Sequence, residues 1–215
     1  MSSLCLMTLR VVNYAEPMSR WEPGSAARLQ AAAFELFTEH GFAAVTVPEI
    51  TARAGLTTRT FFRHFADKRE VLFAAEEQLP EVMAQVFATA PPALTPMEVI
   101  IKGFRDVVAP RFDGLRDHLR VRRGIVLSDP GLRERDLRKR ALVAEGAAAG
   151  FRDRGLAGLE AVLAAQVAAT ILDTAITRWL DDAGDRELGE VILETAAALE
   201  TVVSPATRCQ DQRLG

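Results

Sequence analysis

Hydrophobic residues recur at helical spacing along most of the chain, and no segment of any length alternates between polar and apolar positions as a strand would. The first helical pattern begins at Ser25 and ends before Gly41, a residue suited to close a helix. Two short patterns follow within 46–65, and a longer one begins near Asp67. We therefore predict an all-α fold that opens with these four helices.

Five further helical patterns follow the segment 88–96, which is rich in proline and alanine. Their expected ranges are 96–108, 115–128, 132–154, 159–180 and 187–203. The total is therefore about nine helices. Asp67 and Glu70 have capping-box spacing at the start of the fourth helix. Pro80 lies inside that helix, where it kinks or divides it or simply begins a new segment.

The segment 46–65 carries the strongest local signals. Thr46 and Glu49 have the spacing of a capping box, so a helix should begin at Val47. Gly55 has the backbone freedom for a sharp turn, and Thr57 is placed to cap a second helix. Two short helices joined by a tight turn form a helix-turn-helix.

In the second of these helices, Phe61 and Phe65 are four residues apart and share one face, which we expect to be buried. The opposite face carries Thr58, Arg59, Phe62 and Arg63. A helix fits the major groove of B-DNA, where arginine can bind guanine with two hydrogen bonds and threonine can contact a thymine methyl group or a phosphate. This face therefore indicates DNA binding.

Positive charge is concentrated around this helix. The range 53–69 contains one acid, Asp67, and five basic residues, although the whole chain has a formal net charge of -3. The basic residues are Arg53, Arg59, Arg63, Lys68 and Arg69. Surface arginines occur on many small helical pairs, but that alternative does not explain why caps, turn glycine, core spacing and charge all agree.

The run TVPEITARAGLTTRTFFRHFADKREVLF, preceded by FELFTEHGF, resembles the DNA-binding domain of the tetracycline-repressor-like (TetR) family of bacterial transcriptional regulators. The resemblance covers residues 25–73. It implies a dimeric repressor with an N-terminal three-helix helix-turn-helix domain and a C-terminal helical domain for ligand binding and dimerisation. Residues 57–64 would then recognise an operator.

The family pattern also implies roles for single residues. Thr46 and Lys68 would contact phosphates, while Thr58, Arg59 and Arg63 would reach bases. Many relatives carry tyrosine at the position of Phe62, so this chain lacks a phosphate hydrogen bond there and keeps an apolar contact. His64 either reaches a phosphate or packs. The expected DNA-binding set is Thr46, Thr57, Thr58, Arg59, Thr60, Phe62, Arg63, His64 and Lys68.

We expect four regions along the chain. These are a flexible arm at 1–23, the helix-turn-helix domain at 24–73, the ligand-binding and dimerisation domain at 74–205, and a flexible tail at 206–215. Translation starts at Met1 or at Met18, and both remain open because the recognisable domain begins only after Met18.

Composition and motifs exclude several classes of protein. Cys5 and Cys209 lie near opposite ends without metal or redox spacing, which indicates a reduced, cytoplasmic protein. We expect no membrane span, because no apolar run approaches the required length, and no signal peptide. Hydrolase, metalloprotease and phosphate-loop motifs are absent from the sequence. We therefore expect no catalytic residue, metal site or cofactor.

The last two helices are the most apolar, and alanines at 164, 165, 168 and 169 would let a neighbouring backbone approach closely. Their partly apolar outer faces would be wet in a monomer, which favours a homodimer through a four-helix contact. The alternative is that both helices are central core. Because one small helix-turn-helix makes few contacts, a dimer on a palindromic operator is the better interpretation.

The expected ligand is a hydrophobic or amphipathic small molecule of unknown identity. Aromatic residues with sparse polar anchors would line its pocket: Phe104, Phe112, His118, Phe151, Asp173, Thr177, Arg178 and Trp179. The arginine-rich tracts 116–123 and 133–140 would suit a phosphorylated ligand such as an acyl-coenzyme A, or form an ordinary solvated face. The predicted function is a ligand-released repressor, and the alternative is a helical protein-binding scaffold.

Overall fold

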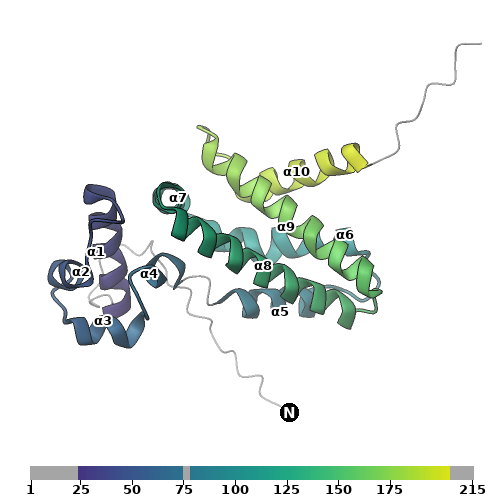
Figure 1. The fold of residues 1–215 in the computed structure, drawn as a ribbon. Helices are drawn as coiled ribbons and strands as arrows, with labels where there is room; N and C mark the ends of the chain where they lie inside the picture. The colour runs from purple at the N-terminus through teal and green to yellow at the C-terminus, as the bar shows by residue number, and fades with distance from the viewer. Residues whose placement is uncertain (1–23, 75–77, 204–215) are drawn as a thin grey trace, which may run out of the picture.

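The computed structural model describes residues 24–74 and 78–203, and within these ranges it contains ten α-helices and no strand (Figure 1). The helices are α1 Ser25–His40, α2 Val47–Arg53, α3 Thr58–His64, α4 Glu70–Phe73, α5 Leu79–Thr89, α6 Pro96–Gly103, α7 Arg116–Ser128, α8 Pro130–Asp153, α9 Gly158–Asp181 and α10 Leu188–Val203. The predicted all-α fold is confirmed. The arm at 1–23, the tail at 206–215 and both cysteines lie outside the described residues.

The helix expected from Asp67 onward is divided, which accounts for the additional helix. α4 ends at Phe73, and Pro80 lies in the first turn of α5, where its missing N–H is not needed. Asp67 caps the start of α4, because its Oδ1 accepts the backbone N–H groups of Arg69 at 2.8 Å and Glu70 at 3.0 Å. The predicted reciprocal capping box is wrong, since the Glu70 carboxylate pairs instead with cations of α8.

The helix expected at 96–108 changes its hydrogen-bond pattern part of the way along. The α-helix ends at Gly103, continues as a π-helix over Phe104–Val108, and tightens into a 3₁₀ turn over Ala109–Phe112. A Cβ on Gly103 would lie only 2.4 Å from a methyl group of Val86. Glycine at this position therefore allows α6 to approach α5 closely.

The described residues form two main hydrophobic cores. The first unites α1 to α4 and includes Phe61 and Phe73, while the second unites α5, α6, α9 and α10 around residues such as Ile171 and Ile192. The first core also includes Ile125 and Val126 of α7 and Leu132 of α8, which the sequence did not predict. We call 24–74 the N-terminal domain and 78–203 the C-terminal domain.

α9 passes between α8 and α10 and contacts both. By length and composition α9 could cross a membrane, with a mean hydropathy of 1.5 in its most apolar window, so the expectation that no run approaches such a length is wrong. In this structure Ala161 and Ala175 on α9 are fully buried against neighbouring helices. α9 therefore contributes one face to the core of the C-terminal domain, while only 28% of its most apolar window is buried.

Candidate nucleic-acid interface

The helix-turn-helix forms as its caps predict. The backbone N–H and the hydroxyl of Thr46 both donate to Oε2 of Glu49, each at 2.7 Å. These bonds, the hydroxyl's first, lower the pKa of Glu49 below its ordinary value. Gly55 turns the chain with a φ of 63°. Because the backbone N–H and the hydroxyl of Thr46 both donate to Glu49, the structure does not support the phosphate contact predicted for the Thr46 side chain.

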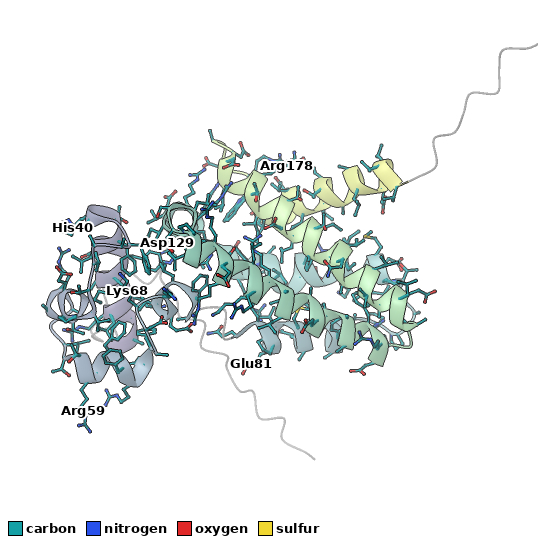
Figure 2. The ribbon with its side chains drawn as sticks, in the orientation of Figure 1. His40, Arg59, Lys68, Glu81, Asp129 and Arg178 are labelled. Carbon is teal, nitrogen blue, oxygen red and sulfur yellow. The ribbon has the colours of Figure 1, made fainter. Side chains whose placement is uncertain are left out.

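α3 presents the predicted outward face. Phe61 is fully buried, Phe65 is nearly so, and their ring centroids lie 5.4 Å apart. The residues Thr58, Arg59, Phe62, Arg63 and His64 are exposed. Figure 2 shows the Arg59 side chain extending away from the rest of the protein.

The two outward guanidiniums of α3 have no partner among the residues that the structure describes. Across the described ranges, neither Arg59 nor Arg63 forms an ion pair or a hydrogen bond through its side chain. Phe62 is 59% exposed, and the inner side of its ring meets the buried Phe61 ring edge-on at 5.4 Å between centroids. These side chains are therefore available to a partner without the loss of an existing contact.

Thr57 and Thr60 serve mainly as the cap of α3. Oγ1 of Thr57 accepts the backbone N–H of Thr60 at 3.2 Å, and their hydroxyl groups lie 3.0 Å apart. Thr57 is exposed and Thr60 is half-buried. Their direct effect in this structure is to hold the first turn of α3.

Lys68 has a different environment from the one predicted. Its Nζ donates to the carbonyl oxygens of Phe42 at 2.8 Å, Ala43 at 3.3 Å and Val45 at 2.8 Å, and lies 4.4 Å from the Phe42 ring centroid. Burial lowers its pKa. Since an ammonium has three donors, this geometry does not support the predicted phosphate contact. Lys68 instead fixes the loop between α1 and α2.

Arg53 also contributes less to the positive surface than the count of basic residues indicates. Its guanidinium pairs with Glu35 at 3.1 Å and with Glu39 at 2.9 Å, both on α1. The Arg53 hydrogen bond lowers the pKa of Glu39. Fewer basic side chains than expected therefore contribute unpaired positive charge to the described part of this surface. They are Arg59, Arg63 and Arg69.

Arg28 of α1 holds the turn between α2 and α3, a role that sequence reasoning missed. Its Nη2 donates to the carbonyl oxygen of Ala54 at 2.7 Å, and a Cβ on Gly55 would lie 3.1 Å from the same nitrogen. The two partners are 26 residues apart in the chain. No local spacing could reveal this contact.

The residues predicted to line a ligand pocket do not form one site. Phe104 and Trp179 are buried core residues, and the Trp179 ring meets the half-buried Phe112 ring edge-on at 6.4 Å. The indole N–H of Trp179 donates to the carbonyl oxygen of Arg186 at 2.9 Å. Phe151 belongs to the same core cluster and packs edge-on against Phe87 at 5.0 Å, so these aromatic side chains fill the core.

The polar members of the set are also dispersed. Asp173 pairs with Arg140, Arg178 pairs with Glu194 at 3.6 Å, and both lie at the surface. Thr177 is half-buried on α9. His118 contacts the N-terminal domain instead, with its ring 4.3 Å from that of Phe34.

Two open cavities border α9 in the described structure. One, of about 520 Å³, lies where α6, the α8–α9 connection and α9 meet, and the other, of about 320 Å³, lies between α8 and α9. Neither is lined by any of the eight residues predicted for the ligand. Within residues 24–74 and 78–203, no group of three His, Cys, Asp or Glu side chains is placed to hold a metal ion.

Comparison with known proteins supports the interpretation of the N-terminal domain. Residues 29–75 match the family described as bacterial regulatory proteins, tetR family. The HTH-type transcriptional regulator TcmR of Streptomyces glaucescens is 33% identical over 82 residues, which cover 38% of this chain and 36% of that protein. The match therefore spans about a third of the relative's length.

Solved structures extend the likeness to the helical fold of most of the chain. FadR of Thermus thermophilus, a TetR-family repressor in complex with lauroyl-CoA, aligns with a TM-score of 0.54 at 24% identity and covers 88% of this chain and 99% of that one. A TetR-family protein of Syntrophomonas wolfei aligns with a TM-score of 0.56 at 14% identity, covering 83% and 94%. Residues 29–75 therefore match the tetR family of bacterial regulatory proteins, and the described helices share the fold of these solved structures.

Proposed function

We propose that this protein is a cytoplasmic, sequence-specific transcriptional regulator that binds a palindromic operator as a homodimer and is released by a small molecule. The observation that carries the proposal is the outward face of α3, where Arg59 and Arg63 have no partner in the described structure. The buried rings of Phe61 and Phe65 hold this face in place.

The exposed side chains suit the two kinds of contact that DNA offers. Arg59 and Arg63 can donate two parallel hydrogen bonds to a guanine in the major groove. Thr58 can contact a thymine methyl group, and His64 can reach the phosphates that border the groove. Phe62 supplies apolar contact. We assign no direct DNA contact to Thr46 or Lys68, because the donor groups of both residues form hydrogen bonds within the N-terminal domain.

A homodimer through α9 and α10 would cover apolar surface that is wet in the single chain. Leu163 on α9 is 55% exposed and Leu193 on α10 is 42% exposed. Two copies of this pair of helices would form a four-helix contact around a twofold axis. The dimer would then present two copies of α3 to half-sites about 34–36 Å apart, one turn of B-DNA.

The proposed effector is a hydrophobic or amphipathic small molecule that binds the C-terminal domain. FadR of Thermus thermophilus holds lauroyl-CoA, which supports this chemical class without identifying the ligand of this chain. The arginine-rich tracts 116–123 and 133–140 are less suited to bind a phosphorylated ligand than the sequence alone indicated. Arg116 and Arg120 bind carbonyl groups of the protein, and Arg123 pairs with Asp181 at 2.8 Å.

Release would follow from differential binding between two states. A ligand that favours a different arrangement of the C-terminal domain shifts the population toward dimers whose two N-terminal domains no longer match the operator. Affinity for the operator then falls. Titration of one operator with and without fatty acids and their coenzyme A thioesters tests this step, and an unchanged Kd throughout would exclude that class of effector.

The alternative, a helical scaffold that binds only protein, explains the apolar faces of α9 and α10 but not the unpaired arginines of α3. Binding of duplexes from the regions that flank its own gene, compared with shuffled duplexes of equal composition, separates the two functions. The regulator predicts selective binding that weakens steeply as salt rises. Equal weak binding of every duplex would reject the regulator and favour the scaffold.

A further inference from the structure

α7 contacts both domains, and its two halves have different partners (Figure 1). The C-terminal half packs into the core of the N-terminal domain, where Ile125 and Val126 are buried. Arg122 donates from Nε to the carbonyl oxygen of Leu72 at 2.8 Å, and its guanidinium lies 4.9 Å from the Phe73 ring centroid. This half of α7 is therefore held against the N-terminal domain.

The N-terminal half of α7 is bound to the end of α9. Arg116 donates from Nη2 to Asp182 at 2.6 Å, and Arg120 donates from Nε to Leu180 at 2.7 Å and from Nη2 to Asp182 at 2.6 Å. The acceptors on this side are backbone carbonyl oxygens, those of Trp179, Leu180, Asp182 and Gly184, while Nη1 of Arg120 also donates to the Asp117 carboxylate on α7 itself at 3.3 Å. Arg116 also lies 5.3 Å from the Trp179 ring centroid.

Two of these acceptors, the carbonyl groups of Trp179 and Leu180, belong to the last turn of α9, while Asp182 and Gly184 follow the helix. The last carbonyl groups of a helix have no N–H donor within the helix and carry partial negative charge. A guanidinium supplies several charged donors in a fixed plane, so it holds both the position and the direction of the helix end. α7 thus joins the N-terminal domain to the end of α9 through directed contacts on both sides.

Two further connections run between the domains. In the covalent path, α4 ends at Phe73 and α5 begins at Leu79. α8 pairs with Glu70 through Arg135 and Lys139 and with Asp173 of α9 through Arg140, and alanine side chains form a small core where α8 packs on α9. The Arg140–Asp173 pair is exposed to solvent, where an ion pair contributes little, and contacts between methyl groups have no preferred direction. The partly buried bonds of Arg116 and Arg120 therefore hold the end of α9 more firmly than the contacts of α8 do.

We propose that Arg116 and Arg120 are positioning residues that determine which half-site spacing the dimer accepts. α9 is one of the two helices assigned to the dimer contact, and α7 fixes the N-terminal domain against its end. The distance between the two copies of α3 is therefore set through these two arginines. The inference rests on the proposed function, since it needs an operator and a dimer.

The test compares the wild type with the double variant Arg116→Gln/Arg120→Gln on operators of different spacing. The operator is the fragment that the wild type selects, together with versions that have one or two base pairs added or removed at the centre. We expect the wild type to favour its own spacing by about tenfold or more, and the double variant to bind all spacings within about twofold. Arg138→Gln is the matched control, because Arg138 lies exposed on α8 and pairs with Glu134.

Sedimentation and circular dichroism accompany each titration, so that loss of the dimer or of helix is not taken for loss of spacing preference. If the double variant does not fold, the single variant Arg120→Gln gives the same comparison. A variant that folds, forms the wild-type dimer and keeps the wild-type spacing preference overturns the inference alone. A wild type that selects no duplex at any spacing overturns the proposed function instead.

Discussion

The Nζ of Lys68 lies 2.8 Å from the carbonyl oxygen of Val45 and fixes the loop that leads into the helix-turn-helix. The same ammonium donates to two more carbonyl groups of this loop, those of Phe42 and Ala43. Lys68 is therefore a structural cation of the N-terminal domain. Its charge is directed into the protein, whereas the guanidinium of Arg59 is directed toward solvent (Figure 2).

Lys68→Met should lower thermal stability without changing how binding depends on salt. The substitution leaves three carbonyl groups without their charged donor, and we expect a loss of about 1–3 kcal/mol of unfolding free energy. Denaturant unfolding measures this loss. The slope of log Kd against log salt should match the wild type, because no phosphate contact is removed.

Arg63→Gln is the matched comparison for that slope, since it removes an exposed cation of α3. Its slope should be shallower by roughly two per dimer if Arg63 lies against phosphates, and unchanged if Arg63 contacts only bases. A shallower slope for Lys68→Met with unchanged stability would instead restore the phosphate contact for Lys68.

Arg59→Ala should weaken operator binding by about 1–3 kcal/mol per half-site and relax specificity at one base pair. The side chain has no partner in the described structure, so protein stability should not change. Fluorescence anisotropy with the operator and with a non-specific duplex measures both affinities. Arg138→Ala, which removes an exposed arginine of α8, should leave both unchanged. Unchanged operator affinity for Arg59→Ala would refute its assignment to base recognition.

Leu163→Glu and Leu193→Glu should each disrupt the dimer, because each places a charge on the apolar face assigned to the four-helix contact. Sedimentation should show monomers, and operator affinity should fall roughly a hundredfold as the second half-site contact is lost. Leu142→Glu is the control: Leu142 is 61% exposed but lies on α8, outside the proposed contact. Wild-type sedimentation for both α9 and α10 variants would exclude this dimer.

Stability should fall as the pH falls below about 6.5, partly because of His118. Its half-buried ring lies against Phe34, and burial first, then the Arg122 charge, lower its pKa from 6.5. The unfolded chain therefore takes up a proton at a higher pH than the folded protein does. The stability due to neutral His118 is complete above the unfolded pKa and decreases as the pH falls toward the folded one.

Melting temperatures from about pH 8 to 5.5 test this prediction, and the decrease should be smaller in His118→Phe than in the wild type. His40→Gln is the control, because the His40 side chain is 60% exposed at the end of α1. An equal decrease for the wild type and His118→Phe would assign the pH dependence to other groups.

The sequence predicts the parts of this structure that depend on local spacing. The Thr46 and Thr57 caps, the turn at Gly55 and the buried pair Phe61 and Phe65 all lie within about one or two helical turns of their partners. The α7 and α8 residues in the first core could not be predicted in this way. Their partners are distant in the chain, and an apolar helix face does not specify which core it joins.

The partners of two arginines could not be predicted for the same reason, because these partners are distant in the chain. Arg28 and Arg120 look like solvated residues in the sequence, yet they bind carbonyl groups 26 and 60 residues away. A count of basic residues also overstates the positive surface, because Arg53 is neutralised by two acids of α1. The sequence shows which residues are charged, but only the tertiary fold shows which residues they pair with.

The most direct measurement of the central claim is selection of bound fragments from a pool of random duplexes, followed by sequencing. We expect an inverted repeat with half-sites about 34–36 Å apart, and a guanine in each half-site that Arg59→Ala no longer requires. Recovery of fragments with no shared sequence, or of single half-sites without a repeat, would contradict it.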